Sequence, residues 1–324
     1  MIYSSASKWL AWAPGGLLHT NIAACAAFAS ISGSSPATAA TIGSVAIPRM
    51  KERNYDTRLL LGSVAGGGTL GILIPPSITM IVYGMLSMTS VGALFAGGVL
   101  PGIMLSIMFM SYIAIRVIRN PKLAPREKFP TLKELFFSLI GMWPFFIMAV
   151  VVLGGIFGGF MTPTEAAAVG SSVAIIIGLI LRKLNWQVFR VSVVEAVKTS
   201  VMVLFILMGA FVFAGFLADT RVPSAIAIYV ASLGWSGLPI LLAIYLLYIF
   251  LGCFIDPCSI MVITLPAILP ILNNFGIDLV GRNPLFLDNA ARYSSAVSFP
   301  FYHSVVSFVP GIIADEKEKR VLWN

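Results

Sequence analysis

The chain has 324 residues, of which 58% are hydrophobic and only 10% are charged. A soluble domain carries roughly 25% charged residues, and a mean hydropathy of +0.95 leaves more apolar side chains than a water-surrounded core could bury. These values exclude a soluble globular protein and indicate a polytopic membrane protein. The net charge of +8 does not indicate a nucleic-acid partner, because the basic residues lie in short loops between apolar runs.

Five apolar windows are long enough to span a bilayer, which takes about 20 residues. In chain order they cover residues 58–87, 91–118, 135–157, 164–181 and 199–217. The loops at 49–58, 116–133 and 182–198 hold 14 of the 21 Lys and Arg residues, so we expect them to be cytoplasmic. Spans that alternate in direction then place every basic loop on the inner side.

Two further apolar segments are broken in the middle and have both ends on one side of the membrane. Residues 14–48 are interrupted at Ser32–Pro36 and begin and end near basic residues. Residues 237–272 are interrupted at Gly252–Pro257 and start from the opposite side. Non-helical backbone at membrane depth is tolerated only inside protein or beside water. Each segment is therefore predicted to be a re-entrant helical hairpin.

The two predicted hairpins share an exit pattern that favours an inverted-topology repeat. Asp56 lies eight residues after Pro48, and Asp278 lies eight residues after Pro270. Together with the opposed orientation, this is the trace that an inverted repeat leaves in a sequence, although a chance match is the alternative. The predicted organisation is a first repeat at 1–118, a cytoplasmic loop at 119–134, an incomplete second repeat at 135–280 and a divergent polar tail at 281–324.

Hydroxyl-bearing and small residues gather at the tip of the first predicted hairpin. A break there leaves free N–H and C=O groups at mid-membrane depth, which suit an ion or an anionic substrate. The alternative is a helix-packing face rich in small residues, but Pro36 at the tip favours a site. The candidate binding residues are Ser32, Gly33, Ser34, Ser35 and Thr38.

Residues 66–77 combine a glycine run with two adjacent prolines, and we expect the helix to unwind there. A half-helix starting near Pro76 would direct its positive end at the middle of the bilayer, while the last carbonyls of the first half would face a cation. A simple proline kink is the alternative, but it leaves the glycine run unexplained. The candidate binding residues are Gly68, Thr69, Gly71, Pro75, Pro76 and Ser77.

The second predicted tip holds Asp256 between Gly252 and Pro257, the remaining candidate site residues. An ionisable group at membrane depth is a functional candidate, but Asp256 could equally cap the helix that begins at Pro257. Thr162–Glu165 has the pattern of a helix N-terminus. The chain has no metal-binding or nucleophile motif of an enzyme, and its cysteines lack paired spacing. We therefore expect no enzyme activity, resident cofactor or metal centre.

Three segments resemble the large membrane subunit of tripartite ATP-independent periplasmic (TRAP) transporters. They are FASISGSSPATAA at 28–40, GILIPPSI at 71–78 and GGFMTPTEAAA at 158–168. The resemblance implies an all-α elevator-type fold with inverted repeats, in a bacterial inner membrane. It also implies sodium-coupled import of an organic acid, such as sialic acid, a C4-dicarboxylate or a sugar acid. A small membrane subunit and a periplasmic substrate-binding protein would be its partners.

Two features depart from the family pattern. Family members have further membrane segments before the first hairpin, and their second repeat continues into another Pro-Pro helix. The equivalent pair would fall near Val297, but residues 281–324 contain neither the motif nor a spanning apolar run. Alternatives to a working importer are therefore a truncated or frame-shifted remnant that does not transport, and a passive channel.

Overall fold

The computed structural model describes residues 2–125, 130–232, 237–252, 254–255 and 257–274, and their regular structure is helical. The elements are α1 (Ile2–Trp9), α2 (Leu17–Ser32), α3 (Ser35–Glu52), α4 (Thr57–Leu73), α5 (Ile78–Ser87), α6 (Val91–Arg119), η1 (Pro121–Leu123), α7 (Leu132–Ile140), α8 (Trp143–Ala149), the π-helical η2 (Val150–Gly154), α9 (Gly155–Phe157), α10 (Pro163–Ile180), α11 (Trp186–Thr220), α12 (Val222–Ser232), α13 (Gly237–Gly252) and α14 (Pro257–Asn274). The expected all-α, polytopic class is confirmed.

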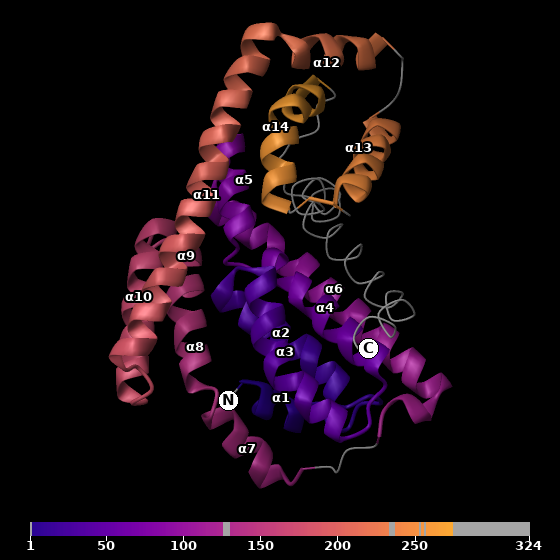
Figure 1. The fold of residues 1–324 in the computed structure, drawn as a ribbon, viewed down its shortest axis with the longest axis vertical. Coiled ribbons are helices and arrows are strands. Elements are labelled where there is room, and N and C mark those ends of the chain that lie inside the picture. Colours follow the sequence, from indigo (N-terminus) through magenta and orange to yellow (C-terminus); the bar gives the residue numbers. More distant parts are fainter. Residues whose placement is uncertain (1, 126–129, 233–236, 253, 256, 275–324) are drawn as a thin grey trace, which may run out of the picture.

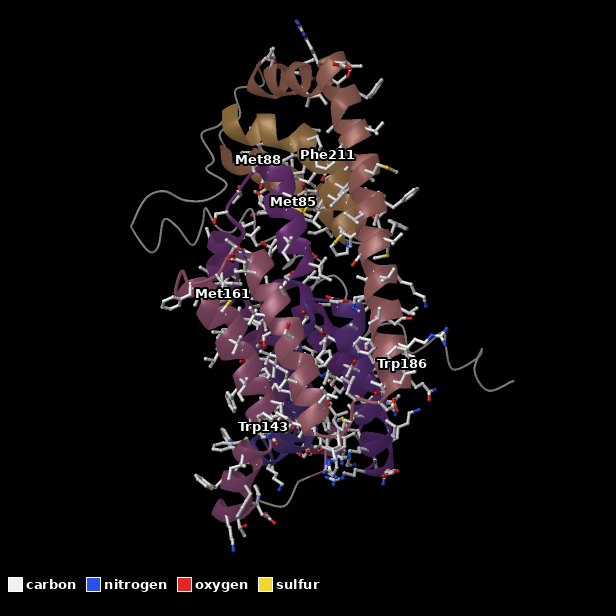
Figure 2. All side chains as sticks on the ribbon, turned by 90° about the vertical axis from the view of Figure 1, so that its left-hand side faces the viewer. Met85, Met88, Trp143, Met161, Trp186 and Phe211 are labelled. Atoms are coloured by element: carbon white, nitrogen blue, oxygen red, sulfur yellow. The ribbon has the colours of Figure 1, made fainter. Side chains whose placement is uncertain are left out.

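Four helical segments in the described part of the chain are long and apolar enough to cross a membrane. They are Thr57–Ser87, Val91–Arg119, Pro163–Ile180 and Trp186–Leu217. Large apolar side chains project from the surface of the protein, as Figure 2 shows for Met88 and for Phe211 on α11. Such a surface is suited to contact with lipid, since a water-soluble monomer rarely exposes a large continuous apolar patch.

The window at 135–157 does not form the single continuous span predicted. Instead α7 ends at Ile140 and α8 starts at Trp143, and the backbone then widens into the π-helical turn of η2. Pro144 lies in the first turn of α8, where its missing N–H costs nothing, so a new helix starts there more readily than an old one continues. The prediction failed because hydropathy does not report such interruptions.

Helices α2, α3 and α4 pack into one bundle, and α6 packs across it (Figure 1). Apolar side chains of α2, α4 and α6 form one buried cluster, including Leu18, Leu60 and Leu105, none of which is exposed. The α2–α3 pair is joined by Gly33 and Ser34, at the position predicted for the first tip.

The glycine run of α4 lies in continuous helix, so the expectation that it unwinds is wrong for residues 66–73. A methyl group at Gly67 would lie 2.9 Å from Cys25 Sγ on α2, and one at Gly68 would lie 2.6 Å from the Ala39 methyl on α3. The glycines therefore allow two neighbouring helices to approach α4 closely, as small residues commonly do between membrane helices. The interruption is confined to Ile74–Ser77.

Helix α11 runs from the group formed by α8–α10 to the group formed by α12–α14, as Figure 1 shows. Within the second group, Tyr248 Oη on α13 lies 3.0 Å from Thr264 Oγ1 on α14. These two helices come before and after residues 253–256 in the sequence, where the second tip is predicted. Asp256 itself, Asp278 and the tail at 281–324 lie outside the described residues.

Candidate ion and substrate site

The tip between α2 and α3 is held in shape by its own polar groups. Gly33 ends α2 in a left-handed conformation, with φ of 61°, and its N–H donates to the Ala29 carbonyl. Thr38, which is fully buried, donates from Oγ1 to the Ser34 carbonyl at 2.8 Å and lies 2.9 Å from Ser32 Oγ. Three of the predicted site residues thus form one hydrogen-bonded group at the tip.

The break between α4 and α5 is short, and Pro75 and Ser77 are buried in it while Ile74 and Pro76 are half-buried. The peptide bond between Pro75 and Pro76 is cis, and Ser77 continues in an extended conformation before α5 starts at Ile78. Ser77 is fully buried and donates from Oγ to the Ile72 carbonyl at 2.7 Å. This hydroxyl therefore occupies one of the carbonyls that a helix leaves unpaired at its C-terminal end.

The tip and the break lie directly against each other. The Ile78 N–H donates to the Gly33 carbonyl at 3.2 Å, so the first turn of α5 is tied to the end of α2. A methyl group at Gly33 would lie 2.7 Å from the Pro76 carbonyl oxygen, and one at Gly71 would lie 2.6 Å from the Ser34 carbonyl oxygen. Glycine is thus required at both positions, because two backbone segments approach each other closely there.

A longer contact also joins the hairpin to α4. The Ser35 hydroxyl lies 3.4 Å from the Thr69 carbonyl, and the Thr69 hydroxyl donates within its own helix to the Gly66 carbonyl at 2.6 Å. The structure therefore gathers most of the predicted residues of the first half around one contact: Ser32, Gly33, Ser34, Ser35, Thr69, Gly71, Pro76 and Ser77. Gly68 lies nearby but serves helix packing.

This contact combines two opposite helix ends. The C-terminal end of α4 presents carbonyl oxygens and partial negative charge, which suit a cation. The N-terminal end of α5 presents N–H groups and partial positive charge, which suit an anion. No group of three or more His, Cys, Asp or Glu side chains that could hold a metal occurs among the described residues. An ion bound here would be held by neutral carbonyl and hydroxyl oxygens, which are the ligands that hard cations prefer.

The start of α14 lies beside the start of α5. Cys258, one residue after Pro257, has its Sγ 3.6 Å from Thr79 Oγ1. Behind this contact, Met261 on α14 and Met80 on α5 belong to one buried apolar cluster. The second interrupted segment therefore reaches α5 close to its break. Gly252 and Pro257 are half-buried there.

Two further polar residues of the α2–α4 contact were not predicted. Asn21 is fully buried on α2 and donates from Nδ2 to Ser63 Oγ on α4 at 2.7 Å. A carboxamide inside an apolar helix indicates a contact with another helix, because it needs a hydrogen-bond partner there. Sequence alone does not reveal that the partner is a serine 42 residues away.

Thr162 and Glu165 form the helix start that the sequence predicts. The Glu165 N–H donates to Thr162 Oγ1, and the Thr162 N–H donates to Glu165 Oε2 at 2.8 Å, which is a capping box. Glu165 is exposed at this helix end. Its role is therefore to begin α10.

Interrupted helices that pack against each other inside a polytopic helical protein are a feature of many membrane transport proteins. The comparison with known families agrees: the model of the DctM component of tripartite ATP-independent periplasmic transporters matches residues 1–285. The chain belongs to this family, whose members transport rather than catalyse.

Curated relatives carry the same family name. The chain is 38% identical over 266 residues to a C4-dicarboxylate TRAP transporter large permease of Pseudomonas aeruginosa, with 82% of this chain and 62% of the relative covered. It is 35% identical to a sialic acid large permease of Vibrio cholerae, covering 86% and 65%. It is 37% identical to an isethionate permease of Oleidesulfovibrio alaskensis, covering 88% and 45%. The chain thus spans less than two thirds of these relatives.

Proposed function

We propose that this chain acts as the large permease subunit of a sodium-coupled, binding-protein-dependent importer of organic acids in a bacterial inner membrane. It would work with a small membrane subunit and a periplasmic substrate-binding protein. The relatives are named for C4-dicarboxylate, sialic acid and isethionate transport. These compounds are all small organic anions, so the proposed substrate carries a carboxylate or a sulfonate, and a sugar acid also fits this class.

The contact between the α2–α3 tip and the α4–α5 break carries the proposal. Sodium would bind among the hydroxyl and carbonyl oxygens near Ser34 and the end of α4, and the substrate anion near the start of α5. Broken helices in other transporters use their ends in this way. Because both ligands would lie beside one contact, sodium could favour the conformation that accepts the anion, which is the requirement for coupling.

Uptake into proteoliposomes tests the proposal. The full chain is reconstituted with the small membrane subunit and the binding protein encoded with it, and labelled succinate, sialic acid, isethionate and gluconate are offered. A sodium gradient should drive uptake of at least one compound, and an equal potassium gradient should not. Equal uptake with sodium and potassium gradients would instead indicate a passive channel. So would uptake that is the same for inward and outward gradients.

A pair of glycine variants connects this activity to the site. Gly33 and Gly159 both have left-handed backbone, with φ of 61° and 70°, but only a methyl group at Gly33 would meet another atom closely. Both alanine variants share the backbone strain. Gly33→Ala should lower sodium-driven uptake at least tenfold, while Gly159→Ala should stay within about twofold of wild type. Equal losses of uptake in the two variants would show that transport does not depend on the α2–α3 tip.

A further inference from the structure

An apolar crevice runs between α2 and α3 on one side and α8 and α10 on the other, and α2 and α8 also touch each other directly. Its first part is a cavity of about 460 Å³ lined by Tyr3, Phe28 and other apolar side chains, with Lys183 at one end. Its second part, about 370 Å³, extends past Pro76 to Pro163. Ile31, Met148 and Ala174 line both cavities, so the two form one continuous crevice.

The crevice runs along the whole of α10, from Pro163 at the helix start to Lys183 just beyond its end. An 18-residue helix is about 27 Å long, which is close to the roughly 30 Å thickness of the hydrocarbon core of a bilayer. Within the membrane, the occupant of such a crevice must be apolar along nearly its whole length.

The chemistry of the wall favours acyl chains over a polypeptide as the occupant. An extended peptide would leave its N–H and C=O groups unsatisfied against the apolar side chains that line the crevice. A helix satisfies these groups within itself, but it would have to come from another segment or chain. Acyl chains are both narrow and free of polar groups, and the surrounding bilayer supplies them.

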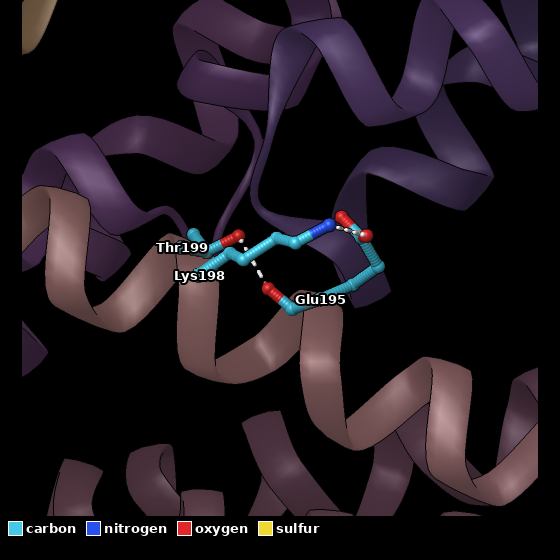
Figure 3. Close-up of polar contacts among 3 residues, drawn as sticks. All are labelled: Glu195, Lys198 and Thr199. Carbon is cyan, nitrogen blue, oxygen red and sulfur yellow. Dashed lines mark hydrogen bonds and ion pairs between the residues drawn. The ribbon is translucent and has the colours of Figure 1, made fainter.

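Positive charge is concentrated at one end of the crevice. Lys183 lines the first cavity directly, and the Arg49 guanidinium carbon lies 5.9 Å from the ring centre of Tyr3, which lines the same cavity. Lys198 differs, because its ammonium group is paired with Glu195 at 2.7 Å, as Figure 3 shows. A lipid headgroup at the Lys183 end would therefore be preferred when it is anionic.

We propose that acyl chains of an anionic phospholipid fill this crevice, with the headgroup beside Lys183. The lipid then lies between the α8–α10 group and the α2–α3 hairpin, beside the direct contact of α2 with α8, and it reaches Pro76 at the helix break. This inference depends on the crevice alone and not on the transported substrate or the coupling ion.

Retention of lipid by the purified full chain tests the proposal. The protein is incubated in detergent with equal amounts of phosphatidylglycerol and phosphatidylcholine of the same acyl chains, separated from free lipid, and its bound lipid is quantified by mass spectrometry. Wild type should retain phosphatidylglycerol with about a fivefold preference, the contribution of one Lys to an anionic headgroup. Lys183→Gln should abolish the preference, whereas Lys198→Gln should keep it.

A matched pair on α10 tests the location of the acyl chains. Ala174→Phe fills the junction of the two cavities, while Ala168 is exposed on α10 and lines neither. The total lipid retained should fall at least twofold in Ala174→Phe and remain at the wild-type level in Ala168→Phe, with melting temperatures recorded for both. Equal retention in the two variants would overturn the proposal. If Ala174→Phe does not fold, equal headgroup preference in Lys183→Gln and Lys198→Gln would overturn it.

Discussion

At the scale of single residues, Gly71 has no space for a side chain. The nearest atoms to a methyl group at this position belong to the backbone of Ser34 and Ser35, at 2.6 to 2.8 Å. Backbone cannot rotate out of the way as a side chain can, so the hairpin tip would have to move away from α4. A single methyl group at Gly71 therefore tests whether contact between tip and helix is needed.

Gly71→Ala should separate the tip from α4 and lower sodium-driven uptake at least tenfold. It should also lower the free energy of unfolding by about 1–3 kcal/mol, the usual cost of overpacking. Gly209→Ala is the control, because a methyl group at Gly209 on α11 has no atom within 4 Å. Uptake and melting temperature of the two variants are compared in the same preparation. Wild-type uptake by Gly71→Ala would show that the contact is dispensable.

At the scale of helices, the interruptions at 33–34 and 74–77 could be predicted from sequence, but the one at 141–142 and the packing partners of the helices could not. Pro75–Pro76 and the Gly33–Ser34 pair end helices by local backbone chemistry, which sequence reveals directly. The prediction that the glycine run of α4 unwinds is wrong because its packing partners, Cys25 and Ala39, are distant in sequence. A glycine that admits a neighbouring helix and a glycine that loosens its own helix give the same pattern.

The capping box of α10 offers a prediction about a helix end. Thr162→Ala removes the side chain that accepts from the Glu165 N–H, so the free energy of unfolding should fall by about 1 kcal/mol. Sodium-driven uptake should change little, because this end of α10 is not part of the tip–break contact. Ser172→Ala, in the exposed middle of α10 and outside both cavities, should leave thermal unfolding in detergent unchanged. A tenfold loss of uptake in Thr162→Ala would give this end a direct role in transport.

At the scale of the whole molecule, residues far apart in sequence meet at the start of α5. Thr79 and Cys258 are separated by 179 residues, and their side chains lie 3.6 Å apart. This contact could not be predicted from sequence, because it depends on how α11–α14 return to the first half. Figure 1 shows this return, with α14 beside α5.

A cysteine cross-link tests this long-range contact. In a Cys253→Ser background, Thr79→Cys should form a disulfide with Cys258 on mild oxidation, because Thr79 Oγ1 lies 3.6 Å from Cys258 Sγ and the two sulfurs of a disulfide are about 2 Å apart. The cross-link should stop sodium-driven uptake, and dithiothreitol should restore it. Thr89→Cys, beyond the far end of α5, should not cross-link. Failure of Thr79→Cys to cross-link would show that α14 does not lie against α5.

The proposed function requires one sodium-responsive site at the contact between the α2–α3 tip and the α4–α5 break. Thr38 is suited to test it, because its Oγ1 donates to the Ser34 carbonyl and its side chain is fully buried. Thr38→Val keeps the shape and removes this bond, worth about 1 kcal/mol, whereas Thr38→Ser keeps the hydroxyl. We therefore expect the two variants to differ in their response to sodium.

The most direct measurement is the melting temperature of the purified full chain in sodium chloride and in potassium chloride of equal concentration. A ligand that binds the folded state stabilises it, by about 2.7 kcal/mol at 100 times its dissociation constant. Sodium should raise the melting temperature of wild type and Thr38→Ser above the potassium value, and Thr38→Val should lose most of this difference. Identical melting temperatures in the two salts, or a full sodium response in Thr38→Val, would contradict the account.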